Sequence, residues 1–124
     1  MTEAADAALL ERLRPELFRA VTAAVRDRTV SPGATRAALR ALINACDVSG
    51  RNRALIAEAG AAHEAIELEL ASWPSSLGGG TSRRVTELVM ALLARLCACA
   101  EGRAAVAAHP AGVAVVSRDR KSVV

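Results

Sequence analysis

The sequence is poor in aromatic residues and in lysine, and it has no long hydrophobic run. Tyrosine is absent, phenylalanine and tryptophan occur once each, and Lys121 is the sole lysine. The longest uninterrupted apolar stretch, 88–94, is far shorter than the roughly 18 residues that a membrane span requires. We therefore expect no transmembrane helix and no membrane partner.

The sequence also shows no secretory signal and no disulfide framework, and both absences bear on the expected compartment. The N-terminus opens with Glu3 and Asp6 and has no basic region followed by an apolar core, so we expect no secretory signal. Three cysteines in 124 residues are too few, and odd in number, for a disulfide framework. These features predict a soluble cytoplasmic protein with reduced thiols.

The charge balance does not indicate a nucleic-acid partner. Sixteen basic residues against thirteen acidic ones give a net charge of +3, and both signs are scattered along the chain. Surfaces that bind single-stranded nucleic acid combine basic residues with aromatic ones, which this sequence nearly lacks. We therefore interpret Arg51, Arg53, Arg83 and Arg84 as parts of solvated helix faces.

A helical hydrophobic period runs through almost the whole chain, and no segment shows the alternation of a half-buried strand. The sequence thus predicts an all-α fold. Because proline lacks an amide hydrogen and is favoured in the first helical turn, Pro15 is expected to begin a new helix. The expected helices cover residues 1–14, 15–28, 31–46, 51–59, 61–71, 81–99 and 103–108, with a last one from 112.

The chain also matches itself at an offset of about 50 residues. The matched positions are Leu39 with Val89, Leu42 with Leu92, Ile43 with Leu93, Cys46 with Leu96, and Arg53 with Arg103. A long helix, a tight turn, a short helix and a breaker recur in the same order. Without a Ser/Gly-rich insertion at 72–82, the period is roughly 40 to 42 residues, within the range of armadillo and HEAT repeats.

The amino-acid sequence of the repeat resembles that of a known family. The stretch Asn52–Ala61, NRALIAEAGA, resembles the armadillo signature. In the second copy, Cys-x-Cys before Ala-Glu-Gly-Arg and the later His-Pro-Ala-Gly-Val resemble the variant found in plant U-box ubiquitin ligases. The resemblance implies an armadillo-type right-handed α-solenoid fragment of about two and a half repeats over 15–117, with an N-terminal helix at 1–14 and a non-repeat tail at 118–124.

The resemblance also implies a function. In that family a U-box recruits the ubiquitin-conjugating enzyme and the armadillo array holds the protein substrate. No U-box is present in the sequence, so the expected role is the substrate-binding part of a ligase, with no catalytic residue, no cofactor and no activity alone. Because arrays usually need three or more repeats, we expect an open apolar face around Val113, Val115 and Val116.

Cysteine and histidine give no predicted metal site. On one expected helix, Cys97 and Cys99 are two residues apart and would point to nearly opposite sides. We interpret them, with Cys46, as small buried hydrophobic residues. His63 and His109 have no companion ligand at a fixed spacing, so neither is expected to bind a metal.

Glu64 and Glu67 are the candidate binding residues. They lie at i and i+3 of the expected helix 61–71 and therefore share a face. The resemblance implies that the third helix of a repeat lines the concave groove. Our hypothesis is a mildly acidic groove that receives a basic or extended partner segment; an ordinary solvated helix face is the simpler alternative.

A different function class remains as an alternative. The Ala/Arg-rich composition and short helices also fit a small all-α DNA-binding regulator. That alternative requires a helix-turn-helix with basic residues on one recognition helix. Arg36 and Arg40, on the expected helix 31–46, are its candidate residues.

Overall fold

The computed structural model describes residues 3–27, 29–72 and 80–123, with side chains described for 13–27, 29–71 and 83–117. These residues form helices and turns without a strand, which confirms the all-α prediction. The helices are α1 (Glu3–Arg26), α2 (Pro32–Val48), α3 (Gly50–Glu58), α4 (Ala61–Ser72), α5 (Gly80–Leu96), α6 (Ala100–Ala108) and α7 (Gly112–Val123). None of the described helices is long and apolar enough to cross a bilayer.

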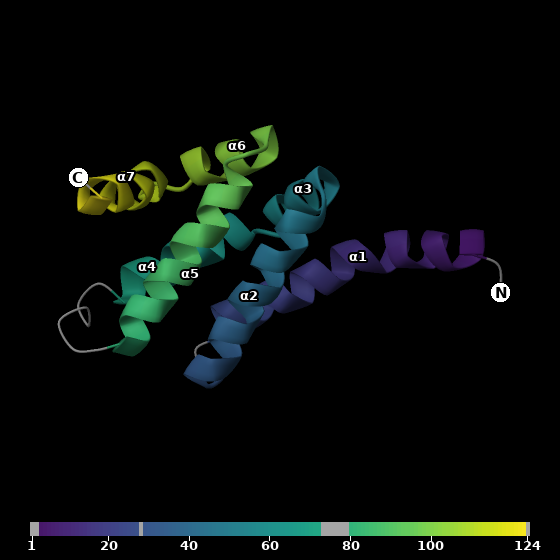
Figure 1. Cartoon of the computed structure of the whole chain (residues 1–124), viewed down its shortest axis with the longest axis horizontal. Helices are drawn as coiled ribbons and strands as arrows, with labels where there is room; N and C mark the ends of the chain where they lie inside the picture. The colour runs from purple at the N-terminus through teal and green to yellow at the C-terminus, as the bar shows by residue number, and fades with distance from the viewer. Residues whose placement is uncertain (1–2, 28, 73–79, 124) are drawn as a thin grey trace.

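The helices stack in rows that follow the internal repeat. The long helix α2 packs along α5, the short α3 packs on α6, and α4 lies between α1 and α7. Figure 1 shows the two ends of the chain at opposite ends of this stack. Each row pairs helices of the same place in the repeat, so the described residues form the armadillo-repeat fragment that the periodicity predicts.

The core lies between these rows. The face predicted from the repeat is buried in both copies: Leu39, Leu42, Ile43 and Cys46 on α2, and Val89, Leu92, Leu93 and Leu96 on α5. Ile56 of α3 and Ile66 of α4 complete it and are both fully buried. Since each such aliphatic side chain contributes about 1.5–3 kcal/mol on burial, this shared core is what fixes the long helices against each other.

The helices of the first repeat begin and end at residues that favour helix ends. The Ser31 hydroxyl accepts a hydrogen bond from Ala34 N at the start of α2, and the Ser49 hydroxyl accepts one from Asn52 N at the start of α3. These are N-caps, which satisfy amide groups that have no partner inside the helix. Gly60, after α3, has φ +89°, the left-handed conformation expected of a glycine just past a helix end.

The turn of the second repeat differs from the prediction. Helix α5 ends at Leu96 and α6 begins at Ala100, so the expected helix 81–99 and the break at 100–102 are wrong. Cys99 is the N-cap of α6, and its Sγ accepts a hydrogen bond from Gly102 N at 3.4 Å. A Cβ on Gly102 would lie 1.8 Å from the Leu96 carbonyl oxygen, so glycine allows α6 to start directly over the end of α5.

Proline 15 does not break the first helix. Helix α1 is continuous from Glu3 to Arg26 with Pro15 inside it, so the separate helix at 1–14 is a wrong prediction. A proline inside a helix removes one amide donor and crowds the preceding turn, a cost that other interactions can outweigh. Phe18 and Val25, both buried, hold the C-terminal half of α1 on the core, while its N-terminal half extends beyond the other helices (Figure 1).

The C-terminal helix also departs from expectation. Helix α7 runs without interruption through Val123, so residues 118–123 of the predicted tail continue the backbone of the last helix, and residue 124 lies outside the described residues. Val115 is fully buried, whereas Val113 is 66% exposed. The expected apolar face therefore does not include Val115. Of the predicted insertion at 72–82, residues 73–79 lie outside the described residues.

Candidate functional site

Helix α4 carries three carboxylates whose surroundings differ. Its apolar side, including Ala62, Ala65 and Ile66, is buried in the core. Glu64 lies toward α1, where its Oε2 is 3.7 Å from Arg26 Nε and its side chain is 14% exposed. Arg26 itself is well exposed, so this pair contributes little to stability.

Glu69 is buried between two helices of the chain. It is 2% exposed, and its Oε1 accepts a hydrogen bond from the Thr86 hydroxyl of α5 at 3.1 Å. A buried carboxylate needs such partners because removal from water is costly. Glu69 therefore belongs to the contact between α4 and α5.

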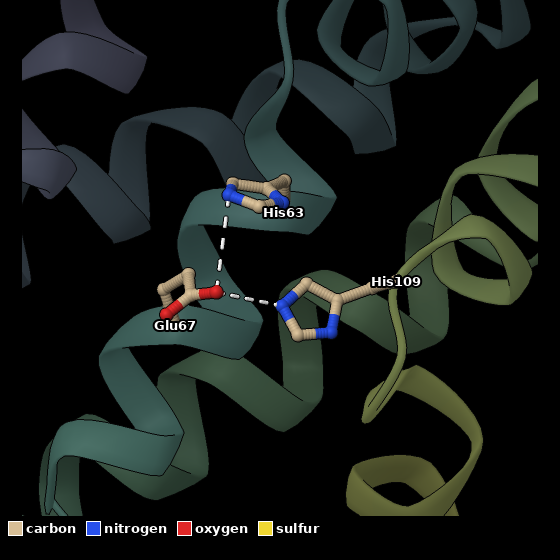
Figure 2. A group of neighbouring side chains, drawn as sticks. All are labelled: His63, Glu67 and His109. Atoms are coloured by element: carbon tan, nitrogen blue, oxygen red, sulfur yellow. Dashed lines mark hydrogen bonds and ion pairs between the residues drawn. The ribbon is translucent and has the colours of Figure 1, made fainter.

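Glu67 lies between two histidines, as Figure 2 shows. Its Oε1 is 2.8 Å from His109 Nε2 and 3.9 Å from His63 Nε2. The two imidazole rings are 5.0 Å apart between centroids and are tilted by 47°. One potential ligand atom from each of these three residues lies within 4.8 Å of the other two. We call His63, Glu67 and His109 the histidine–glutamate cluster.

The turn between α6 and α7 fixes His109. Its side chain is 5% exposed, and its Nδ1 accepts a hydrogen bond from Ala111 N at 2.9 Å. A neutral imidazole has one donor and one acceptor; Nε2 therefore carries the hydrogen and donates to Glu67. The Gly112 amide also donates to the His109 carbonyl at 3.0 Å, which closes the turn and orients the ring toward α4.

The statement that the histidines have no companion is therefore wrong, whereas the expectation that neither binds a metal stays a prediction. Glu67 is a companion of His63 at i+4 on the same helix, and this spacing is visible in the sequence. His109 is 42 residues further along and reaches the same point only because α6 and α7 pack on α4. No local pattern could have identified that third residue.

Glu64 and Glu67 each contact groups of the chain itself. Glu64 faces Arg26 on one side of α4, and Glu67 faces His109 on the other. The acidic groove proposed for these two residues stays a prediction. The structure adds that any partner would meet carboxylates already paired with an arginine or an imidazole.

Cys46 and Cys97 lack the lowered pKa of a reactive thiol. Burial raises the pKa of Cys46 to about 11, and burial also raises the pKa of Cys97. A nucleophilic cysteine needs a lowered pKa. Cys46 is a buried core residue as predicted, but Cys99 is partly exposed and serves as a helix cap, which corrects its assignment to a buried helix face.

Two arginines have equivalent structural roles in the two repeats. Arg53 Nη1 donates to the Cys46 carbonyl at 2.8 Å, and Arg103 Nη1 donates to the Cys97 carbonyl at 3.0 Å. A cation at the C-terminal end of a helix satisfies free carbonyl groups and complements the helix dipole. The interpretation of Arg53 as a solvated residue is therefore wrong.

The helix-turn-helix alternative finds no support in the part of the chain that the structure describes. Arg36 and Arg40 lie on α2, which packs against α1, α3 and α5. The salt bridge between Arg95 of α5 and Asp47 of α2, at 3.1 Å, links the two helices as well. Helix α2 is thus held by three neighbouring helices of the repeat stack, whereas a recognition helix must project toward DNA.

Comparisons with known proteins agree with this architecture. E3 ubiquitin-protein ligase PUB23 of Arabidopsis thaliana is 40% identical over 116 residues, which cover 94% of this chain and 26% of that protein. PUB22 of the same plant is 39% identical over 118 residues, and PUB24 is 33% identical over 152 residues. The chain spans between about a quarter and a third of the length of these curated relatives. No solved structure matches the chain.

A family model agrees over nearly the full length. The model of the plant U-box protein ARM repeat region matches residues 1–120. This range includes both copies of the repeat, the histidine–glutamate cluster and all of α1. The chain therefore belongs to the family of plant U-box protein armadillo-repeat regions.

Proposed function

We propose that this chain is the protein-interaction module of a U-box-type ubiquitin ligase and that it holds the substrate. The observation that carries the proposal is the family match over residues 1–120 together with the stacked helix rows. Three relatives named as E3 ubiquitin-protein ligases support it. The proposed setting is the cytoplasm, where conjugating enzymes and reduced thiols coexist.

The proposed mechanism is positioning. A rigid helix stack holds a bound substrate near a conjugating enzyme that another part of the ligase recruits. The contribution to rate is then an increase in effective concentration and a restriction of orientation. The raised pKa values of Cys46 and Cys97 give no support for a thioester role of these two thiols, and we assign ubiquitin transfer to the conjugating enzyme.

We further propose that Glu64 and Glu67 favour a partner segment that is basic or extended. Glu67 is 45% exposed at its side chain, so water and a partner can both reach it. Its carboxylate already accepts one hydrogen bond from His109, and a carboxylate has capacity for several more. A partner cation would therefore add to the existing contact without displacing it.

A reconstituted ubiquitination reaction tests the proposal. The chain replaces the equivalent repeats of an E3 ligase relative, and the proteins modified by this chimera are compared with the proteins that bind the chain alone. We expect the two sets to overlap and the isolated chain to form no ubiquitin conjugates. Conjugate formation by the isolated chain, or two sets without common members, contradicts the proposed role.

Isosteric variants test the acidic groove separately. Glu64→Gln/Glu67→Gln removes both charges but keeps acceptors for Arg26 and His109. A matched control, Glu58→Gln/Glu101→Gln, removes two exposed charges on α3 and α6. We expect only the first pair to weaken binding of a captured partner, by about tenfold at low salt. Equal binding by both double variants refutes the groove assignment.

A further inference from the structure

We propose that the histidine–glutamate cluster binds a divalent transition-metal ion such as Zn²⁺. The ligand atoms would be His63 Nε2, one oxygen of Glu67 and His109 Nε2, with water in the remaining position. Two imidazoles and a carboxylate are a donor set that zinc uses in proteins. This site shares Glu67 with the proposed acidic groove, whereas His63 and His109 belong to the metal site alone.

The observed distances are close to those that a metal requires. With zinc–ligand bonds of about 2.0–2.2 Å, two ligand atoms around a tetrahedral ion lie roughly 3.3 Å apart. The nitrogen–oxygen distances at Glu67, 2.8 Å to His109 and 3.9 Å to His63, lie on either side of that value. The widest separation within the cluster is at most 4.8 Å, so a small contraction completes the site.

The three side chains differ in exposure in a way that suits such a contraction. His109 is almost fully buried and held by the α6–α7 turn, whereas His63 is 60% exposed at its side chain. His63 and Glu67 lie one turn apart on α4, where their side chains share a face. His63 can therefore change rotamer toward a metal that the fixed His109 and Glu67 have already bound (Figure 2).

One contact opposes metal binding and limits its affinity. Nε2 of His109 now carries a hydrogen, and a metal must displace that proton. A metal-bound imidazole normally donates its other N–H group, but Nδ1 of His109 accepts a hydrogen bond from Ala111 N. The Ala111 amide must turn away when the proton moves to Nδ1, so this site binds more weakly than a preorganised structural zinc site.

Occupancy would have a structural effect. His63 and Glu67 belong to α4, and His109 follows α6, so the ion would join two successive repeats. In the free chain the hydrogen bond between His109 and Glu67 joins these two elements. Metal binding would therefore stiffen the stack between α4 and the α6–α7 turn and raise the melting temperature.

Titration of the full chain with Zn²⁺ and Co²⁺ tests the proposal. We expect one saturable Zn²⁺ site by calorimetry, and Co²⁺ absorption in the visible without the charge-transfer band of thiolate ligands. His63→Ala removes an exposed ligand and is expected to weaken binding at least tenfold while the helical circular dichroism is unchanged. Glu58→Ala and Cys97→Ser are controls, in which binding stays at the wild-type level.

The outcomes are decisive in both directions. A rise in melting temperature with Zn²⁺ in the wild type, absent in His63→Ala, supports the site. No saturable binding, equal binding by wild type and His63→Ala, or a thiolate charge-transfer band with Co²⁺ overturns it. In each of those cases the cluster is a hydrogen-bonded contact between repeats and nothing more.

Discussion

Replacing His109 with alanine tests how much the contact between successive repeats stabilises the fold. The substitution first removes the hydrogen bond to the Glu67 carboxylate. Bonds to charged groups contribute about 1.5–3 kcal/mol, and the half-exposed Glu67 places this one near 1.5 kcal/mol. The substitution lowers stability in two further ways, because His109 also accepts a hydrogen bond and its ring is packed in the interior.

The other two losses are of similar size. Ala111 N loses its acceptor, Nδ1 of His109, at a cost of about 1 kcal/mol in a partly buried position. Removal of the buried imidazole leaves apolar surface unpacked, for about 1 kcal/mol more. We expect His109→Ala to lower the free energy of unfolding by roughly 3–4 kcal/mol, a large share of the 5–15 kcal/mol typical of a domain.

Urea unfolding followed by far-ultraviolet circular dichroism measures this loss. His63→Ala is the control, because His63 is exposed and its contact with Glu67 is long, at 3.9 Å; we expect a change within about 0.5 kcal/mol. A double-mutant cycle of His109→Ala with Glu67→Ala should give a coupling energy of about 1–2 kcal/mol. His109→Gln, whose amide can still donate to Glu67, should retain part of the stability.

A loss of stability for His109→Ala that is no larger than for His63→Ala contradicts the predicted contribution of His109. A coupling energy of zero with Glu67 also contradicts it, because the hydrogen bond would then contribute nothing. A large loss without coupling would place the whole effect in the Ala111 contact and in packing. The results therefore show how much of the stability loss comes from the hydrogen bond to Glu67 and how much from the Ala111 contact and packing.

Two other predictions concern the second repeat and the thiols. Gly102→Ala places a Cβ 1.8 Å from the Leu96 carbonyl oxygen and should cost about 3 kcal/mol or more, whereas Gly33→Ala, with 3.9 Å to its nearest neighbour, should be neutral or slightly stabilising in the same thermal melts. Burial holds the pKa of Cys46 at about 11, so at pH 8 a disulfide reagent should modify Cys97 faster than Cys46 in the native chain. Since the unfolded chain releases the Cys46 proton first, rising pH between about 9 and 11 should lower stability. Equal thiol rates, or equal melts for the two glycine variants, contradict these assignments.

The repeat architecture follows closely from local sequence. Apolar residues at helical spacing predict the buried faces of α2 and α5, and Ser31 and Gly60 mark helix ends by their own conformational preferences. Agreement at an offset of about 50 residues then indicates which helices are equivalent. Equivalent helices stack because each repeat exposes an apolar face that only its neighbour can cover.

The errors arise where distant contacts outweigh a local preference. Proline favours the start of a helix, yet Pro15 lies inside α1, whose following turns are anchored in the core by Phe18 and Val25. Cys99 continues the apolar stripe of α5 in sequence but caps α6, since Gly102 lets the next helix begin close to Leu96. In both cases the residue has the expected local preference, but tertiary packing outweighs it.

Sequence alone determined the all-α class, the repeat period and the membership in a family of interaction modules, because these depend on periodicity and on short motifs. Only the tertiary structure decided the partners of the polar side chains. Glu67 pairs with His109 across 42 residues, and Glu64 pairs with Arg26 of another helix. Periodicity specifies which face of a helix is buried, whereas the meeting of two polar groups depends on how the helices stack.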